Sequence, residues 1–115
     1  MDIKIAFRHK KVGSKPVYPG LESIYNHNDC INDTVNTIIG DYFEFEPLIR
    51  WINTHGYYNG AYITLNRENL TNIRASILAT DGHPSEQMEK FLKLLKIKLD
   101  AAPDAQWISE MRCDW

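Results

Sequence analysis

Two cysteines and four histidines are the side chains of this 115-residue chain best suited to nucleophilic or metal chemistry. His27 and Cys30 are spaced like metal ligands, but a structural zinc site normally has two such pairs, so we expect no metal or other cofactor. Cys30 or Cys113 could be drawn beside a histidine as nucleophile and base, but any chain of this length permits such pairs. The sequence contains no phosphate-binding loop, no dinucleotide-binding glycine motif and no hydrolase or zinc-protease motif. These observations predict a protein that is not an enzyme, and a small enzyme with a dispersed site is the alternative.

Acidic residues dominate the segment between Pro16 and Ile49. It contains six carboxylates and no lysine or arginine, whereas the chain before Pro16 contains five lysine or arginine residues and one aspartate. Charge that is separated in this way mainly steers association and selects partners. The six acidic residues are Glu22, Asp29, Asp33, Asp41, Glu44 and Glu46.

A helix is expected to begin near Asp29. It could end at Gly40, with Tyr42 to Glu46 extended, or continue far enough to include Glu44. Its apolar stripe has helical spacing and consists of Ile31, Val35, Ile38 and Tyr42. In a helix successive residues are rotated by about 100°, which places a set of polar residues opposite or beside this apolar stripe. They are Asp29, Asn32, Asp33, Asn36 and Glu44. With Asp41 and Glu46 they form a predicted surface for a basic partner. A solvated helix face is the alternative, although such faces usually mix lysine with acid.

Aromatic side chains gather around Asn59-Gly60, a dipeptide that predicts a two-residue turn. The cluster consists of Trp51, His55, Tyr57, Tyr58 and Tyr62. Because tyrosine and tryptophan are enriched at interface hot spots, we predict partner contacts at His55, Tyr57 and Tyr58. Packing in the core is the alternative for such a cluster.

Direct binding of nucleic acid is not expected, on two grounds. A sheet that recognises RNA needs aromatic rings on its central strands, but Phe7 of the first strand is a core residue and residues 73–79 contain no aromatic. The acidic segment would also repel phosphate. The basic run from Arg8 to Lys15 is the feature that favours nucleic-acid binding, because it could contact a phosphate backbone.

The first half of the chain predicts a strand, a loop and two helices. Ile3, Ile5 and Phe7 alternate with polar or small residues, which is typical of a strand with one buried face. The stretch from His9 to Gly20, rich in lysine, glycine and proline, predicts a long loop. After the acidic helix, Glu46-Pro47 predicts the start of a short helix that ends near His55.

The second half predicts two strands, a long helix and a final element. Residues 61–65 and 70–79 are both assigned as strands, because Asn66 to Asn69 could form a hairpin turn, although 70–79 also fits a helix face. Residues 84–100 carry a regular apolar stripe and a charge order that matches a helix dipole. Residues 105–113 fit either a last strand or a short helix.

These elements predict a single α+β domain over residues 1–115, with a mainly antiparallel sheet and helices on one face. Their order matches the split βαβ arrangement of ferredoxin-like folds. The alternating N-terminus does not resemble a secretory signal, and no apolar run approaches the ~20 residues that span a bilayer, so we expect a cytoplasmic protein with free thiols and no membrane partner.

In its general character the chain resembles bacterial immunity proteins, or antitoxins, of contact-dependent growth inhibition systems. The resemblance rests on a small, mildly acidic, aromatic-rich chain without a catalytic motif. It implies a stoichiometric inhibitor that neutralises a cognate protein toxin. Such a toxin is often a nuclease with a basic cleft, which an acidic surface could cover. A phage or bacterial regulatory adaptor that binds a host protein is a further alternative.

Overall fold

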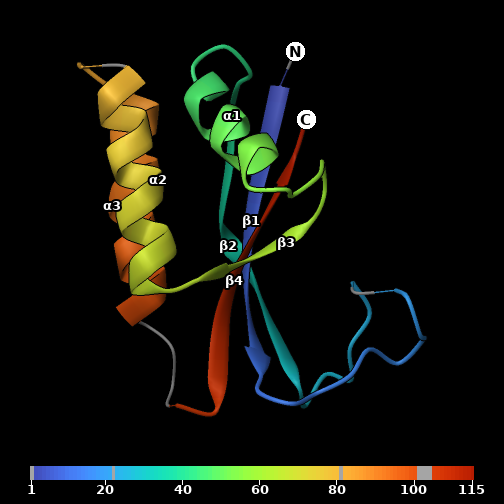
Figure 1. Cartoon of the computed structure of the whole chain (residues 1–115). Helices are drawn as coiled ribbons and strands as arrows, with labels where there is room; N and C mark the ends of the chain where they lie inside the picture. Colours follow the sequence, from blue (N-terminus) through green and yellow to red (C-terminus); the bar gives the residue numbers. More distant parts are fainter. Residues whose placement is uncertain (1, 22, 81, 101–104) are drawn as a thin grey trace.

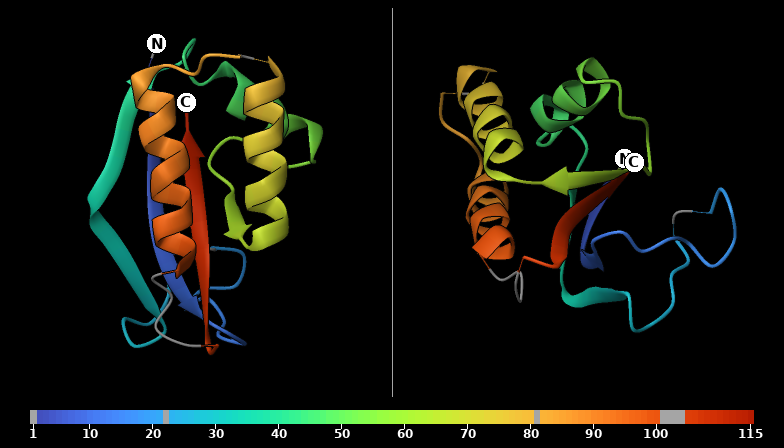
Figure 2. Two further views of the ribbon diagram at one scale, coloured as in Figure 1. Left: turned by 90° about the vertical axis from the view of Figure 1, so that its left-hand side faces the viewer. Right: turned by 60° about the horizontal axis from the view of Figure 1, so that its bottom comes forward.

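One antiparallel sheet of four strands, in the order β2-β1-β4-β3, forms the centre of the fold (Figure 1). The computed structural model describes residues 2–21, 23–80, 82–100 and 105–115. Along the chain the elements are β1 (Asp2–Lys11), β2 (Cys30–Asp41), α1 (Glu46–Thr54), β3 (Tyr62–Leu65), α2 (Arg67–Thr80), α3 (Glu86–Asp100) and β4 (Trp107–Asp114). The three helices lie on the same face of the sheet (Figure 2). The prediction of an α+β domain with an antiparallel sheet and helices on one face is therefore confirmed.

The ferredoxin-like order of elements is not observed. The chain runs strand, strand, helix, strand, helix, helix, strand, whereas the split βαβ arrangement places a helix after the first strand. Two segments cause this difference, because residues 30–41 form a strand and residues 67–80 form a helix.

The predicted acidic helix is wrong, because residues 30–41 form β2. Half of these twelve residues are β-branched, which favours a strand over a helix. A bulge hides this preference in the sequence: Ile5 of β1 pairs with Ile38 and Phe7 pairs with Asp33, so residues 34–37 have no partner in β1. The extra residues break the alternation of period two and leave a spacing that resembles a helix. Gly40, predicted as a helix end, lies within β2, where a Cβ atom would overlap the Phe45 ring.

Residues 70–79 lie in helix α2, so their assignment as a strand is also wrong. Asn66, which we assigned to a hairpin turn, caps the helix instead, because its Oδ1 accepts a hydrogen bond of 2.8 Å from the backbone N–H of Asn69. Ile73 and Ile77, one helical turn apart, are both buried. The alternation of these isoleucines with Ala75 and Ala79, which led to the strand assignment, therefore does not reflect a strand.

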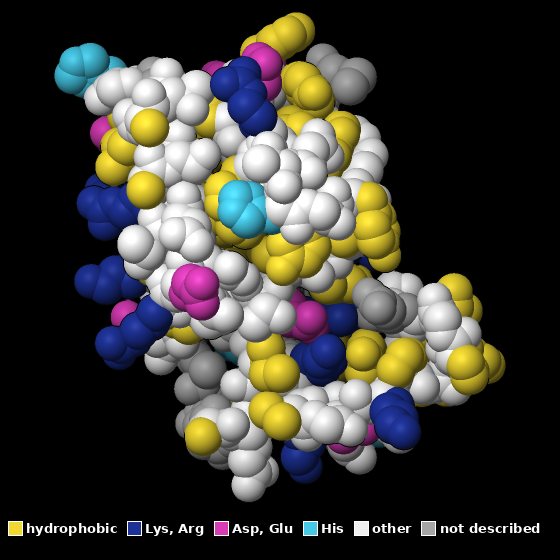
Figure 3. Space-filling view, viewed as in Figure 1, with side chains coloured by type: hydrophobic (Ala, Val, Ile, Leu, Met, Phe, Trp, Pro, Cys, Tyr) yellow, Lys and Arg dark blue, Asp and Glu magenta, His cyan; other side chains and the backbone are white. Residues whose placement is uncertain are grey.

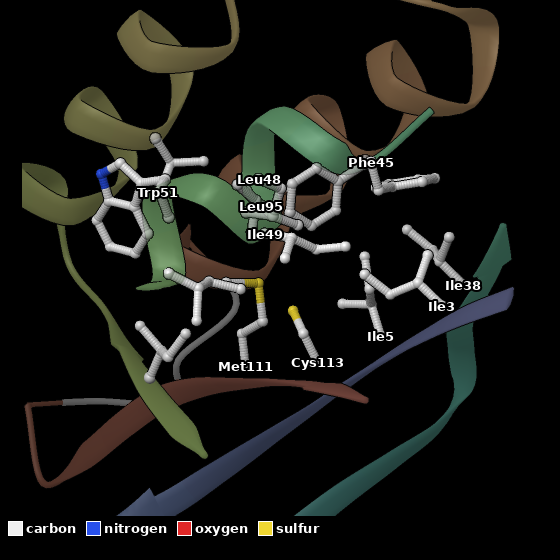
Figure 4. Packing of buried hydrophobic residues seen from close by; sticks show 14 of the residues in the cluster. Ile3, Ile5, Ile38, Phe45, Leu48, Ile49, Trp51, Leu95, Met111 and Cys113 are labelled. Carbon is white, nitrogen blue, oxygen red and sulfur yellow. The ribbon is translucent and has the colours of Figure 1, made fainter. Parts of the chain in front are cut away.

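The core lies between the sheet and the helices (Figure 4). Ile3 and Ile5 of β1 face Phe45 and the side chains of α1 there, and Leu95 reaches the same core from α3. The predictions of helices at 46–55 and 84–100 are confirmed, and Ser85 caps α3 by accepting a hydrogen bond of 3.2 Å from the N–H of Met88. The tail forms β4, which pairs with both β1 and β3.

A long loop, residues 12–29, joins β1 to β2 and projects from the lower end of the sheet (Figure 1). The predicted loop began at His9, but β1 continues to Lys11. None of the helices in the described parts of the chain has the length and apolar character needed to cross a membrane. Glu22 and the side chain of Val35 lie outside the described residues.

Both cysteines are free, and we predict that they differ in reactivity. Burial raises the pKa of the Cys113 thiol, and the Asp114 carboxylate raises it further. Burial also raises the pKa of Cys30, which is only partly enclosed. Because the thiolate is the reactive form, a thiol reagent should modify Cys30 slowly and Cys113 not measurably in the folded protein. After unfolding without reductant, two thiols should react; finding none would indicate a disulfide.

Candidate functional site

The acidic segment does not form one surface, because β2 carries its residues to opposite ends of the sheet. Asp29 precedes β2 at the end where Cys30 pairs with Lys10. Asp41 ends β2 at the other end, opposite Asp2. The single acidic stripe predicted from helical spacing is therefore wrong.

Asp33 and Asn36 are held within the fold on the helix side of the sheet. The Asp33 carboxylate forms an ion pair with Lys98 of α3. It also accepts hydrogen bonds from the backbone N–H of Asn36, at 3.1 Å, and from Asn36 Nδ2, at 2.9 Å. Burial lowers the pKa of Lys98. These contacts link the bulge of β2 to α3, so Asp33 has a structural role.

The other predicted acids meet at a corner between β2 and α1, residues 41–46, which we call the acidic corner. Asp41, Glu44 and Glu46 are all exposed there. Between them lies Phe43, whose side chain is 74 % exposed. The carboxylate of Asp41 accepts a hydrogen bond of 2.8 Å from the N–H of Phe43, which fixes the turn. The corner thus presents an aromatic ring among carboxylates.

Few strong contacts neutralise this corner. Glu46 Oε1 lies 3.2 Å from Arg50 Nη2 in an exposed pair, which is worth about 0.3–0.5 kcal/mol. Glu44 Oε2 accepts a hydrogen bond of 3.4 Å from Ser85 Oγ. The corner lies at the top of the molecule as drawn (Figure 1). Figure 3 shows several Lys and Arg side chains along the edge over α2 and α3, and a basic side chain also stands beside the acids at the top.

The predicted aromatic cluster is divided into two groups. Trp51 stacks with His55 at a centroid distance of 4.3 Å and with Tyr57 at 6.2 Å. His55 Nδ1 donates a hydrogen bond of 2.8 Å to the Trp51 carbonyl, which holds the imidazole in place. Tyr58 lies apart from this stack and is 66 % exposed. It borders a hollow that Tyr62 also lines.

Sequence reasoning missed a group of charged and aromatic residues on the face of the sheet that carries no helix, which we call the open face. In β1, alternation places Lys4, Ala6, Arg8 and Lys10 there, because Ile3, Ile5 and Phe7 point into the core. The residues paired with or next to them on β4 and β3 are Glu110, Arg112, Asp114 and Tyr62. Asn32 of β2 pairs with Arg8 at the border.

Arg8 is the centre of the open face. Its Nε donates a hydrogen bond of 2.9 Å to Glu110 Oε1, and both side chains are buried. The guanidinium carbon lies 3.3 Å from the centroid of Tyr62 and 5.0 Å from that of Tyr25 in the long loop. Lys10 Nζ lies 3.8 Å from the other Glu110 oxygen. The loop therefore folds over a buried ion pair.

Arg112 continues this group toward β3. Its guanidinium carbon lies 5.4 Å from the Tyr62 centroid, and its Nε lies 3.1 Å from Asp114 Oδ2. A hydrogen bond to Tyr62 raises the pKa of Arg112. The sequence did contain a signal for this group, because the outward-facing positions of β1 carry Lys4, Arg8 and Lys10. The signal was missed because the residues from His9 onward were assigned to a loop.

Within residues 2–21, 23–80, 82–100 and 105–115, no three histidine, cysteine or acidic side chains come close enough to hold a metal ion. No family model matches the chain, and no match was found among curated proteins or solved structures. The function must therefore be inferred from the residues themselves. The acidic corner and the open face are the two surfaces whose chemistry suggests a ligand.

Proposed function

We propose that this protein is a stoichiometric inhibitor of the immunity-protein kind, which acts in the cytoplasm and neutralises a cognate bacterial toxin. The observation that carries the proposal is the acidic corner, where Phe43 stands exposed between Asp41, Glu44 and Glu46. The partner of matching chemistry is a protein with a basic cleft, such as a nuclease domain.

The chemistry of the corner supports both steps of such an encounter. Carboxylates on the rim of an interface steer a basic partner and raise the rate of association, most strongly at low salt. A large exposed ring at the centre can then fill a pocket and slow dissociation. Surface charges contribute little to folding, so the corner can serve binding without stabilising the fold.

The stacked residues His55 and Tyr57, which directly follow the C-terminal end of α1, offer a second contact. Both are at least partly accessible, and their rings are held by Trp51. Rigid rings lose little entropy on binding, which favours them as anchors. Asp29 and Asn32 lie at the opposite end of β2, so the proposed surface excludes them.

The test uses the product of the gene next to this one, expressed in a bacterium with and without this chain. We expect this chain to restore growth and to bind the purified product one to one. The double variant Glu44→Lys, Glu46→Lys should fold with a stability within about 0.5 kcal/mol of the parent. Circular dichroism should show that it is folded, because Glu46→Lys also places a cation in the first turn of α1. It should associate at least about ten-fold more slowly, with a weaker dependence on salt, as followed by stopped-flow fluorescence.

A matched control reverses two exposed carboxylates elsewhere, Glu68→Lys and Asp100→Lys. These residues lie on α2 and α3, away from the acidic corner, so the control should associate at the parental rate. Equal slowing in both double variants would show that only net charge matters. If the neighbouring product neither harms growth nor binds this chain, the proposed function is wrong.

A further inference from the structure

Two hollows on the open face meet at Tyr62. The larger, about 470 Å³, is lined by Lys4, Arg8 and the bulged part of β2. The smaller, about 230 Å³, lies between the long loop and the turn before β3, and it is lined by Leu21, Tyr58 and Arg112. Because Tyr62 lines both, the hollows adjoin at this residue, and we call the pair the open-face trough.

Among the described residues in and beside this trough, cations outnumber carboxylates by one. The cations are Lys4, Arg8, Lys10 and Arg112, and the carboxylates next to them are Glu110 and Asp114. Glu110 is already paired with Arg8 and Lys10, and Asp114 is paired with Arg112. Asp33 also borders the larger hollow, but its carboxylate is paired with Lys98. Lys4 forms no ion pair within the part of the chain that the structure describes, so it is the cation most open to a negatively charged ligand.

Aromatic rings stand beside these cations. Tyr58 is 66 % exposed at the smaller hollow, where a flat ring could stack on it. Tyr62 lies near the guanidinium groups of both Arg8 and Arg112, whose carbons are 3.3 and 5.4 Å from its ring centroid. Rings alternating with cations are the surface that single-stranded nucleic acids use for stacking and phosphate contact.

The larger hollow adds neutral hydrogen-bonding groups. Asn32, Thr34 and Thr37 line it, and the last two belong to the bulge that separates β2 from β1. Amides and hydroxyls can meet both donors and acceptors, such as those on base edges and sugars. The trough therefore combines the three contact types that a nucleotide chain needs.

We propose that the open-face trough binds single-stranded nucleic acid. Lys4 and Arg112 would contact phosphates, Tyr58 would stack on a base, and the bulge residues would contact base edges or sugars. The two sequence-based grounds against such binding lose force here. The rings come from β3 and the loops rather than the central strands, and Asp41, Glu44 and Glu46 of the acidic corner line neither hollow. The proposal is independent of the toxin-inhibitor function.

The test measures binding of a labelled oligothymidylate to the full chain by fluorescence anisotropy at several low salt concentrations. Tyr58→Ala should weaken binding by at least about five-fold, and Tyr58→Phe, which keeps the ring, should bind like the parent. Lys4→Gln should lower the slope of log affinity against log salt by about 0.7. Both side chains are exposed, so circular dichroism should show folded variants.

Two matched controls remove the same groups from other surfaces. Phe43→Ala deletes an exposed ring at the acidic corner, and Lys90→Gln deletes an exposed lysine on α3. Both should bind the oligonucleotide like the parent. Absence of saturable binding, equal losses in the controls, or equally strong competition by polyglutamate would overturn the proposal; the last result would indicate an acidic protein segment as ligand. Failure here leaves the inhibitor function standing, since that depends on Glu44 and Glu46.

Discussion

Replacing Glu110 by alanine should lower the free energy of unfolding by about 3–5 kcal/mol, because the change leaves a buried charge without its partner. The side chains of Arg8 and Glu110 are only 2 % and 6 % exposed, and their atoms lie 2.9 Å apart. Lys10 loses the same partner, which adds to the repulsion between cations. Urea denaturation followed by circular dichroism would measure the loss.

The matched control is Glu46→Ala, which removes a carboxylate from the exposed pair with Arg50. That pair should contribute no more than about 0.5 kcal/mol. A further variant, Arg8→Met with Glu110→Leu, removes both charges and should recover most of the stability, since apolar residues of similar size often replace a buried ion pair without loss. Equal losses for Glu110→Ala and Glu46→Ala would contradict the burial of the pair.

Replacing Phe91 by alanine should also cost about 3–5 kcal/mol. Phe91 is fully buried on the inner face of α3, and its ring meets that of Phe45 edge to face at a centroid distance of 5.8 Å. The change removes the ring contact and leaves a cavity between the helix and the sheet. Thermal unfolding would show the loss as a large fall in the midpoint temperature.

Ile97→Ala is the matched control on the same helix, because the Ile97 side chain is 59 % exposed. Alanine is also the better helix former, so this variant should lose less than about 1 kcal/mol. If Phe91→Ala unfolds at the parental temperature, α3 does not pack on the sheet through this residue.

Helix α3 could be predicted because its sequence has one consistent pattern. Met88, Phe91 and Leu95 recur at helical spacing, and Ser85 is a good cap. Strand β2 could not, because the bulge shifts its inward positions and leaves a helix-like spacing of Ile31 and Ile38. Its β-branched content was the better signal. In α2, small alanines between Ile73 and Ile77 imitated the alternation of a strand.

The candidate site was less accessible to sequence reasoning than the fold. Acidic residues were recognised, but their grouping depended on the element that carries them. Of the acids that the structure describes in this segment, Asp41, Glu44 and Glu46 remain together. The contact of Arg8 with Glu110 joins residues 102 positions apart. No local pattern in one sequence reveals such a pair, because strand order decides which side chains meet.

β2 is one of the two edge strands of the sheet, and β3 is the other. Edge strands expose unpaired backbone groups, and many proteins protect them with lysine or proline. The sequence of β2 contains neither. Its protection is the bulge at residues 34–37, which sets the two halves of the strand out of line. A strand of another molecule can therefore pair with only part of this edge. The bulge that lines the open-face trough thus also disfavours aggregation through edge pairing.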